Sequence, residues 1–150
     1  TLSARADRIE ARATGLTITD YKTGTPPKKA DVLDGRAPQL PLEAAIALRG
    51  GFSGLDAHTI ACLRYVQASG GEPAGTTHEF TEDLGALADN AWSKLEALVS
   101  LYDRVETPYQ ALRRPGTRYA YDAYEHLARV KAWTDAHETE AAADGEGGET

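Results

Sequence analysis

The segment LTITDYKTGTPPKK, residues 16–29, ends an apolar strand pattern with two charged residues. Side chains alternate between the two faces of a strand, so Leu16, Ile18, Asp20 and Lys22 share one face. A face that begins with Leu and Ile points into a hydrophobic core. The segment therefore predicts a strand that leaves the core at a carboxylate and an ammonium.

A second strand is predicted directly before this one. Residues 2–12 form a strand pattern, and a tight turn at residues 13–15 joins it to residues 16–23 as an antiparallel pair. In that pairing, the neighbours of Asp20 and Lys22 fall among residues 7–9. Asp7 is the residue there that can reach the same face, and we expect it to approach Asp20 and Lys22.

Two carboxylates and one ammonium at the edge of a core suggest a specific chemistry. Like charges repel strongly where the dielectric constant is low, and a hard divalent cation such as Mg²⁺ removes that repulsion. The cation activates water and polarises a phosphoryl group, while the ammonium stabilises the developing charge. These are the requirements of phosphodiester hydrolysis. For the same residues, an exposed Asp20–Lys22 salt bridge at a strand end is the structural alternative.

The remaining patterns complete an α/β domain. They predict a helix at 38–51, a strand at 58–71, a helix at 81–102 capped by Thr81, and a final helix at 122–138. The resulting order is β-β-α-β-α-α. We expect one domain over residues 1–137 and a disordered acidic tail over 138–150.

Composition narrows the class of protein. The 41% hydrophobic and 26% charged residues are typical of a soluble globular protein, and no apolar run of about 18 residues predicts a membrane span. The single cysteine, Cys62, permits no internal disulfide and predicts a packed side chain in a cytoplasmic protein. The net charge of −7 argues against bulk electrostatic binding of nucleic acid, although residues 1–36 are slightly basic. There, Lys28 and Lys29 either hold a DNA phosphate or belong to a solvated loop.

Longer motifs carry a family resemblance. The segments ARADRIEARATGLTITDYKTGTPP, APQLPLEAAI and YDAYEHLARVKAW together resemble the RecB-like nuclease module of the PD-(D/E)XK superfamily. Within it, they look most like the C-terminal nuclease domain of AddB-type subunits of AddAB helicase-nucleases. The resemblance implies a restriction-endonuclease-like fold: a mixed β-sheet flanked by α-helices, here with an additional C-terminal helical segment.

The resemblance also implies roles for individual residues. Asp7 and Asp20 look like metal-binding carboxylates, joined by the backbone carbonyl of Tyr21. Lys22 looks like the catalytic lysine and Gln39 like the motif glutamine of the site. The implied cofactor is Mg²⁺ or Mn²⁺.

Several positions depart from the family pattern. Glu43 stands where many relatives have Tyr, and a charge on the helix surface is the favoured interpretation. Ala6 replaces the motif Pro. The chain lacks the four cysteines that hold an iron–sulfur cluster in some relatives, so no cluster is expected. The chain is interpreted as an N-terminally truncated fragment whose site lacks an acidic or His residue from a preceding helix.

The resemblance thus implies a Mg²⁺-dependent deoxyribonuclease, an exonuclease domain of a helicase-nuclease that acts in double-strand break repair and recombination. The expected partners are DNA and a helicase subunit of AddA type, with no membrane. Two alternatives stay open: a catalytically incomplete domain that binds DNA or acts as a scaffold, and a stand-alone exonuclease resembling Cas4-type proteins.

Overall fold

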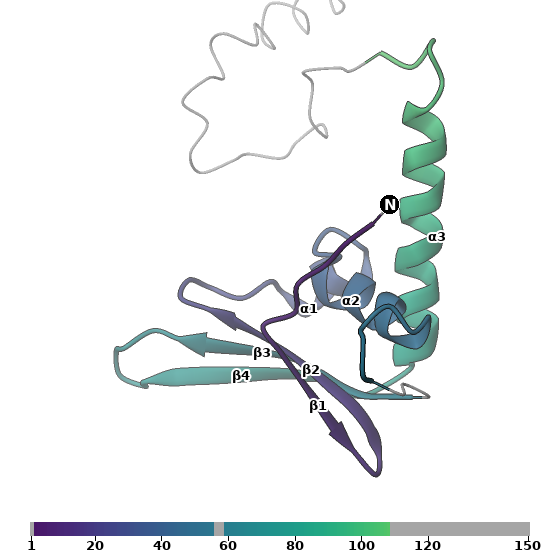
Figure 1. Ribbon diagram of the computed structural model, residues 1–150. Helices are drawn as coiled ribbons and strands as arrows, with labels where there is room; N and C mark the ends of the chain where they lie inside the picture. The colour runs from purple at the N-terminus through teal and green to yellow at the C-terminus, as the bar shows by residue number, and fades with distance from the viewer. Residues whose placement is uncertain (1, 56–58, 109–150) are drawn as a thin grey trace, which may run out of the picture. The chain divides into compact units, whose positions relative to one another are not determined.

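The computed structural model describes residues 2–55 and 59–108 of the chain (Figure 1). This part contains four strands and three helices, in the order β1 (Arg8–Arg12), β2 (Gly15–Lys22), α1 (Lys29–Leu33), α2 (Gln39–Leu48), β3 (Ile60–Ala68), β4 (Gly75–Phe80) and α3 (Leu84–Tyr102). The chain divides into two compact units, 1–104 and 105–150, and all of these elements belong to the first.

The four strands form one mixed sheet in the order β1-β2-β3-β4. The β1–β2 and β3–β4 pairs are antiparallel, while β2 and β3 are parallel and are connected through α1 and α2. A parallel pair needs such a crossover because its strands must start at the same end of the sheet. The predicted fold class, a mixed sheet flanked by helices, is confirmed.

The hairpin of β1 and β2 has the predicted turn but a shorter first strand. Gly15 has φ of +123°, which favours glycine, and a Cβ there would lie 2.7 Å from the backbone oxygen of Thr59. Pairing begins with Arg8 opposite Thr19, so residues 2–7 precede the strand instead of forming part of it. Continued by one residue, the register places Asp7 opposite Asp20.

The core lies between the sheet and the helices. α2 contacts β2, β3 and α3. Its buried side chains include Leu40, Glu43, Ala44 and Ala47, a stripe at helical spacing. The small residues of the helix pack against the strands, and the same rotation of the helix buries Glu43.

The predicted helix at 81–102 is present as α3, with a later start. Asp83, with φ of +50°, is the N-cap residue, so Thr81 does not cap the helix. β4, which was not predicted from the sequence, occupies part of the long segment before α3. Every β4 residue except Phe80 is exposed, so the strand lacks the apolar alternation that would predict it.

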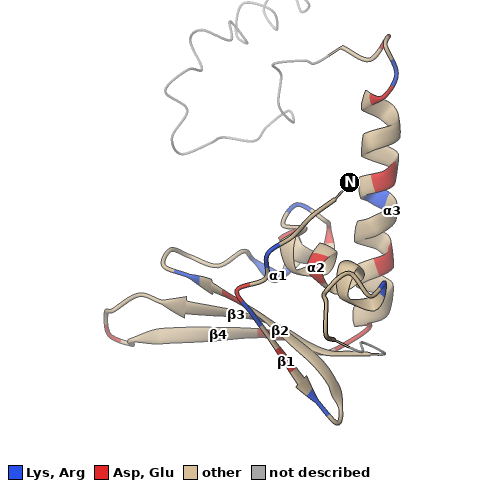
Figure 2. Ribbon diagram, in the orientation of Figure 1, with Lys and Arg blue, Asp and Glu red and all other residues tan. Residues whose placement is uncertain are grey.

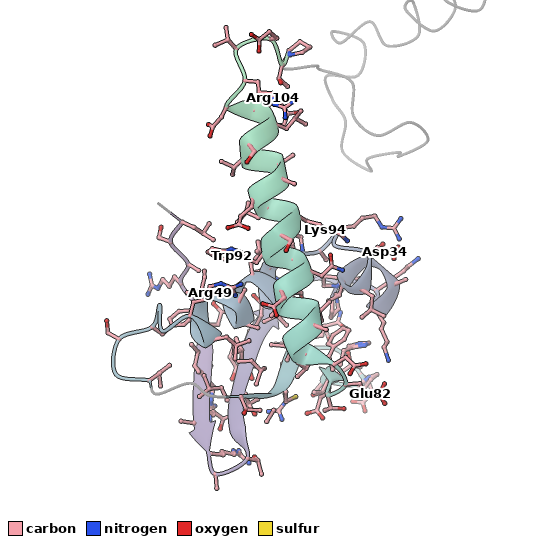
Figure 3. All side chains as sticks on the ribbon, turned by 90° about the vertical axis from the view of Figure 1, so that its right-hand side faces the viewer. Asp34, Arg49, Glu82, Trp92, Lys94 and Arg104 are labelled. Atoms are coloured by element: carbon pink, nitrogen blue, oxygen red, sulfur yellow. The ribbon has the colours of Figure 1, made fainter. Side chains whose placement is uncertain are left out.

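Polar contacts fasten α3 to the earlier helices (Figure 3). The guanidinium of Arg49 lies 4.4 Å from the ring centre of Trp92, and Lys94 Nζ donates to the backbone oxygen of Asp34 at 3.0 Å. The first half of α3 is buried through Leu84, Ala88 and Ala91. Leu98 and Val99 in the second half are exposed.

The remaining predictions concern the C-terminal segments, Cys62 and membrane spans. The final helix expected at 122–138 and the tail at 138–150 lie outside the described residues. Cys62 is buried on β3, as predicted for a packed side chain. None of the helices in the described part of the chain is both long and apolar enough to cross a lipid bilayer.

Candidate active site

The charged end of β2 forms the centre of the site. Asp20 is only 2% exposed, whereas the side chain of Lys22 is 31% exposed, so the pair marks the border between core and solvent. Lys22 Nζ lies 2.8 Å from Asp20 Oδ2. The contact is ionic and lacks hydrogen-bond alignment, since Oδ2 has no hydrogen-bond partner. This geometry combines a buried carboxylate with an ammonium that reaches solvent.

Gln39 brings α2 to the same point. It is the first residue of the helix, and its side chain bridges the two charged groups of β2. Gln39 Nε2 donates to Asp20 Oδ1 at 2.6 Å, and Gln39 Oε1 accepts a hydrogen bond from Lys22 Nζ at 3.0 Å. The structure therefore brings Asp20, Lys22 and Gln39 together from β2 and α2, which are separated in the chain by a segment that contains α1.

Asp7 lies beside this group and has a different partner. Its carboxylate accepts a hydrogen bond from the backbone N–H of Tyr21 at 3.0 Å. The contact ties the segment before β1 to the end of β2, next to Asp20. Tyr21 takes part through its backbone, while its side chain is exposed.

Glu43 also belongs to this site, although a charge on the helix surface was predicted for it. That interpretation is wrong, because Glu43 is only 4% exposed. Gln39 Nε2 donates to Glu43 Oε1 at 3.3 Å, while Glu43 Oε2 has no hydrogen-bond partner. Burial, together with repulsion from Asp20 and Asp7, raises the pKa of Glu43. The spacing of four residues from Gln39 was the available signal, since it places both side chains on one helix face.

Tyr65 of β3 completes the surroundings and was not anticipated. It pairs with Asp20 across the parallel strands and is 1% exposed. Lys22 Nζ lies 5.9 Å from the centre of its ring. Burial and the charge of Asp20 raise the pKa of Tyr65 to about 12, so its hydroxyl stays protonated at neutral pH. The position of Tyr65 beside Asp20 follows from the register between β2 and β3, which the local sequence pattern does not give.

The oxygen atoms at this site are ligands of the kind that a hard divalent cation prefers. Asp20, Asp7 and the carbonyl of Tyr21 offer oxygen ligands, and Mg²⁺ commonly binds one or two carboxylates and keeps several waters. The buried Oδ2 of Asp20 has no aligned donor and retains acceptor capacity. Within residues 2–55 and 59–108, no group of three or more His, Cys, Asp or Glu side chains is arranged to hold a metal ion. Backbone oxygen and water would therefore complete the ligand set.

Fold and site together define a class of protein: a mixed-sheet α/β protein in which the D-x-K end of β2 meets a glutamine at the start of α2. Comparison with known families agrees, since the family model of the PD-(D/E)XK nuclease superfamily matches residues 1–100. The chain therefore belongs to the PD-(D/E)XK nuclease superfamily. Nucleases of this superfamily typically use divalent metals such as Mg²⁺.

Curated relatives match shorter segments. An uncharacterized protein of Rickettsia conorii is 41% identical over 58 residues, which are 38% of this chain and 7% of that protein. An uncharacterized protein of Rickettsia bellii is 32% identical over 96 residues, 55% of this chain and 12% of that protein. The chain thus corresponds to a small part of much longer relatives. No solved structure gives a significant match.

Proposed function

We propose that this chain is a metal-dependent DNA nuclease domain that hydrolyses phosphodiester bonds. One observation carries the proposal: Asp20, Lys22 and Gln39 meet within 3.0 Å at the border of the core, in a chain of a nuclease superfamily. A surface salt bridge would leave its carboxylate solvated, whereas Asp20 is buried and contacts both other residues.

Each residue of the site has a role in this proposal. Asp20 and Asp7, with the carbonyl of Tyr21, would hold Mg²⁺ or Mn²⁺, which supplies a Lewis acid and lowers the pKa of bound water. Lys22 presents a positive charge to the phosphate and stabilises the charge that develops there. Gln39 and Asp20 hold the ammonium of Lys22 from the protein side, so its exposed side remains available to substrate.

The neighbouring loop provides contacts for the DNA backbone. Lys28 and Lys29 are exposed, and neither makes an ion pair within the described part of the chain. Lys and Arg occur both before β1 and on the loop after β2 (Figure 2). Such residues bind phosphates without reading bases. We therefore expect little sequence specificity, because the described residues include no evident base-reading element.

The proposal also includes the larger protein and the partner with which this domain acts. The motifs ADRIE, DYKTG and PQLPLE support an AddB-type nuclease domain, an exonuclease that acts in double-strand break repair and recombination beside a helicase subunit of AddA type. The length of the relatives is compatible with this, since the matched segments make up only 6–12% of them. A stand-alone nuclease would be much shorter.

A cleavage assay tests the activity. The chain is incubated with linear DNA and Mg²⁺ or Mn²⁺, with and without EDTA, beside Asp20→Ala and Lys22→Ala. Glu96→Ala, at an exposed position of α3, is the control. We expect metal-dependent cleavage by the wild type and the control only. Cleavage at the wild-type rate by either site variant contradicts the mechanism, and DNA binding without wild-type cleavage supports the scaffold alternative.

A further inference from the structure

The amide of Gln39 is held in one orientation by three charged side chains. Its NH₂ group faces the carboxylates of Asp20 and Glu43, at 2.6 and 3.3 Å, and its carbonyl oxygen faces the ammonium of Lys22, at 3.0 Å. The reversed amide would place its oxygen against two carboxylates and its NH₂ against a cation. The observed orientation is therefore the one that satisfies every partner.

Two of these three partners have further roles in the proposed function, on which this inference rests. Asp20 would hold the divalent cation, and Lys22 would face the substrate phosphate. With a cation and DNA bound, both side chains would therefore also interact with these groups. Glu43 differs from them, because among the described residues its side chain hydrogen-bonds to Gln39 alone, and one helix carries both residues.

We propose that Glu43 is a positioning residue, the anchor that keeps the amide of Gln39 turned toward Lys22. Residues four apart lie on the same face of a helix, so the Gln39–Glu43 contact is built into α2 and does not depend on the sheet. Burial of Glu43 at 4% exposure fixes its side chain and strengthens the attraction between its carboxylate and the amide. Through Gln39, the charge of Glu43 sets where Lys22 Nζ lies.

A spectroscopic experiment on the whole chain tests the positioning directly. The chain has three Gln residues and one Asn, so four side-chain NH₂ pairs are expected in its ¹H–¹⁵N spectrum. Those of Gln39 are assigned by a Gln39→Met variant. In Glu43→Leu, we expect the Gln39 NH₂ signals to shift and to exchange with solvent about 10-fold faster, since a hydrogen bond to a charged group is lost. The signals of Asn90, at an exposed position of α3, serve as the internal reference.

Kinetics provide the second measurement. Glu43→Leu should lower kcat about 10-fold and change KM for DNA less than about 2-fold, because positioning acts on the reaction and not on DNA binding. Glu43→Gln keeps an acceptor oxygen and should lie between Glu43→Leu and the wild type. It also replaces Glu43→Leu in both measurements if that variant fails to fold. Glu96→Leu, on the exposed face of α3, is the matched control.

The two proposals fail in distinguishable ways. Unchanged Gln39 signals and unchanged kcat in Glu43→Leu overturn the role of Glu43 while wild-type cleavage upholds the nuclease. A wild type that does not cleave DNA overturns the nuclease, and the amide signals still decide whether Glu43 holds Gln39. A rise in KM at constant kcat contradicts positioning and indicates a role in binding DNA.

Discussion

Lys22 Nζ lies 2.8 Å from Oδ2 of Asp20, a carboxylate that the fold buries almost completely. The two residues lie on the same face of β2 as Leu16 and Ile18, so the apolar face of the strand ends at the site. A buried carboxylate is costly unless it is paired and hydrogen-bonded. Lys22 provides the countercharge and Gln39 the hydrogen bond. The pair thus stabilises the fold and also supplies two charged groups of the candidate site.

Replacing Lys22 should lower the free energy of unfolding, because the buried carboxylate of Asp20 then lacks its countercharge. We expect Lys22→Met to lower the free energy of unfolding by about 1–2 kcal/mol, less than for a fully buried pair because the ammonium reaches solvent. Asp20→Asn in the same chain should recover most of the loss, since it removes the unpaired charge. Urea denaturation of both single variants and the double variant measures this coupling. Strictly additive effects would show that the pair is not coupled.

Removing the charge of Asp20 should weaken binding of the cation. We expect Asp20→Asn to lower cleavage about 100- to 1,000-fold, because the cation contributes several kcal/mol to the stabilisation of the transition state. Calorimetric titration with Mn²⁺ should show a parallel loss of affinity. Asp7→Asn should weaken binding in the same direction. Equal Mn²⁺ affinity in the wild type and both variants would place the cation elsewhere.

Glu43 should make stability depend on pH. Burial raises its pKa in the folded chain above the ordinary 4.5. Between those two values the folded state binds more protons than the unfolded state, so stability falls as pH rises from about 4.5 through the raised pKa. Glu43→Gln removes this dependence and should gain stability relative to the wild type over that window. Denaturation at several pH values tests the sign, and a constant difference between the two proteins would contradict it.

The two lysines after β2 should account for part of the salt dependence of DNA binding. For single-stranded DNA, each phosphate contact contributes about 0.7 to the slope of log affinity against log salt concentration. Lys28→Ala and Lys29→Ala should each reduce the slope by about that amount. Arg12→Ala is the control, because Arg12 lies at the far end of the hairpin and pairs with Glu10. Identical slopes in all four proteins would rule out the proposed contacts.

Two glycines should respond oppositely to alanine. Gly15→Ala introduces a Cβ 2.7 Å from the oxygen of Thr59 at a φ of +123°, and we expect a loss of about 1–3 kcal/mol in stability. Gly85 lies within α3, where an added Cβ would meet no atom within 4 Å, so Gly85→Ala should stabilise by up to about 1 kcal/mol. Thermal unfolding compares the two. A stable Gly15→Ala would mean that the hairpin relaxes.

Local patterns account for much of the fold and for part of the site. Alternation along residues 16–22 predicts both the strand and the common face of Asp20 and Lys22, and the pattern around Gln39 predicts a helix there. Such patterns did not predict β4, whose exposed residues do not alternate, or the burial of Glu43 on α2. The burial of Glu43 depends on how the helix is rotated against the strands, and short alanine-rich helices have weak periodicity.

Short stretches of sequence were sufficient for the spacing of D-x-K on one strand and for the turn at Gly15, because these depend on neighbouring residues. Membership of the nuclease superfamily rests on a pattern that extends over residues 1–100. The burial of Glu43 and the position of Tyr65 beside Asp20 became visible only in the folded chain. Both follow from the packing of α2 on the sheet and from the parallel register of β2 and β3. Such contacts join residues far apart in the chain, where no local periodicity acts.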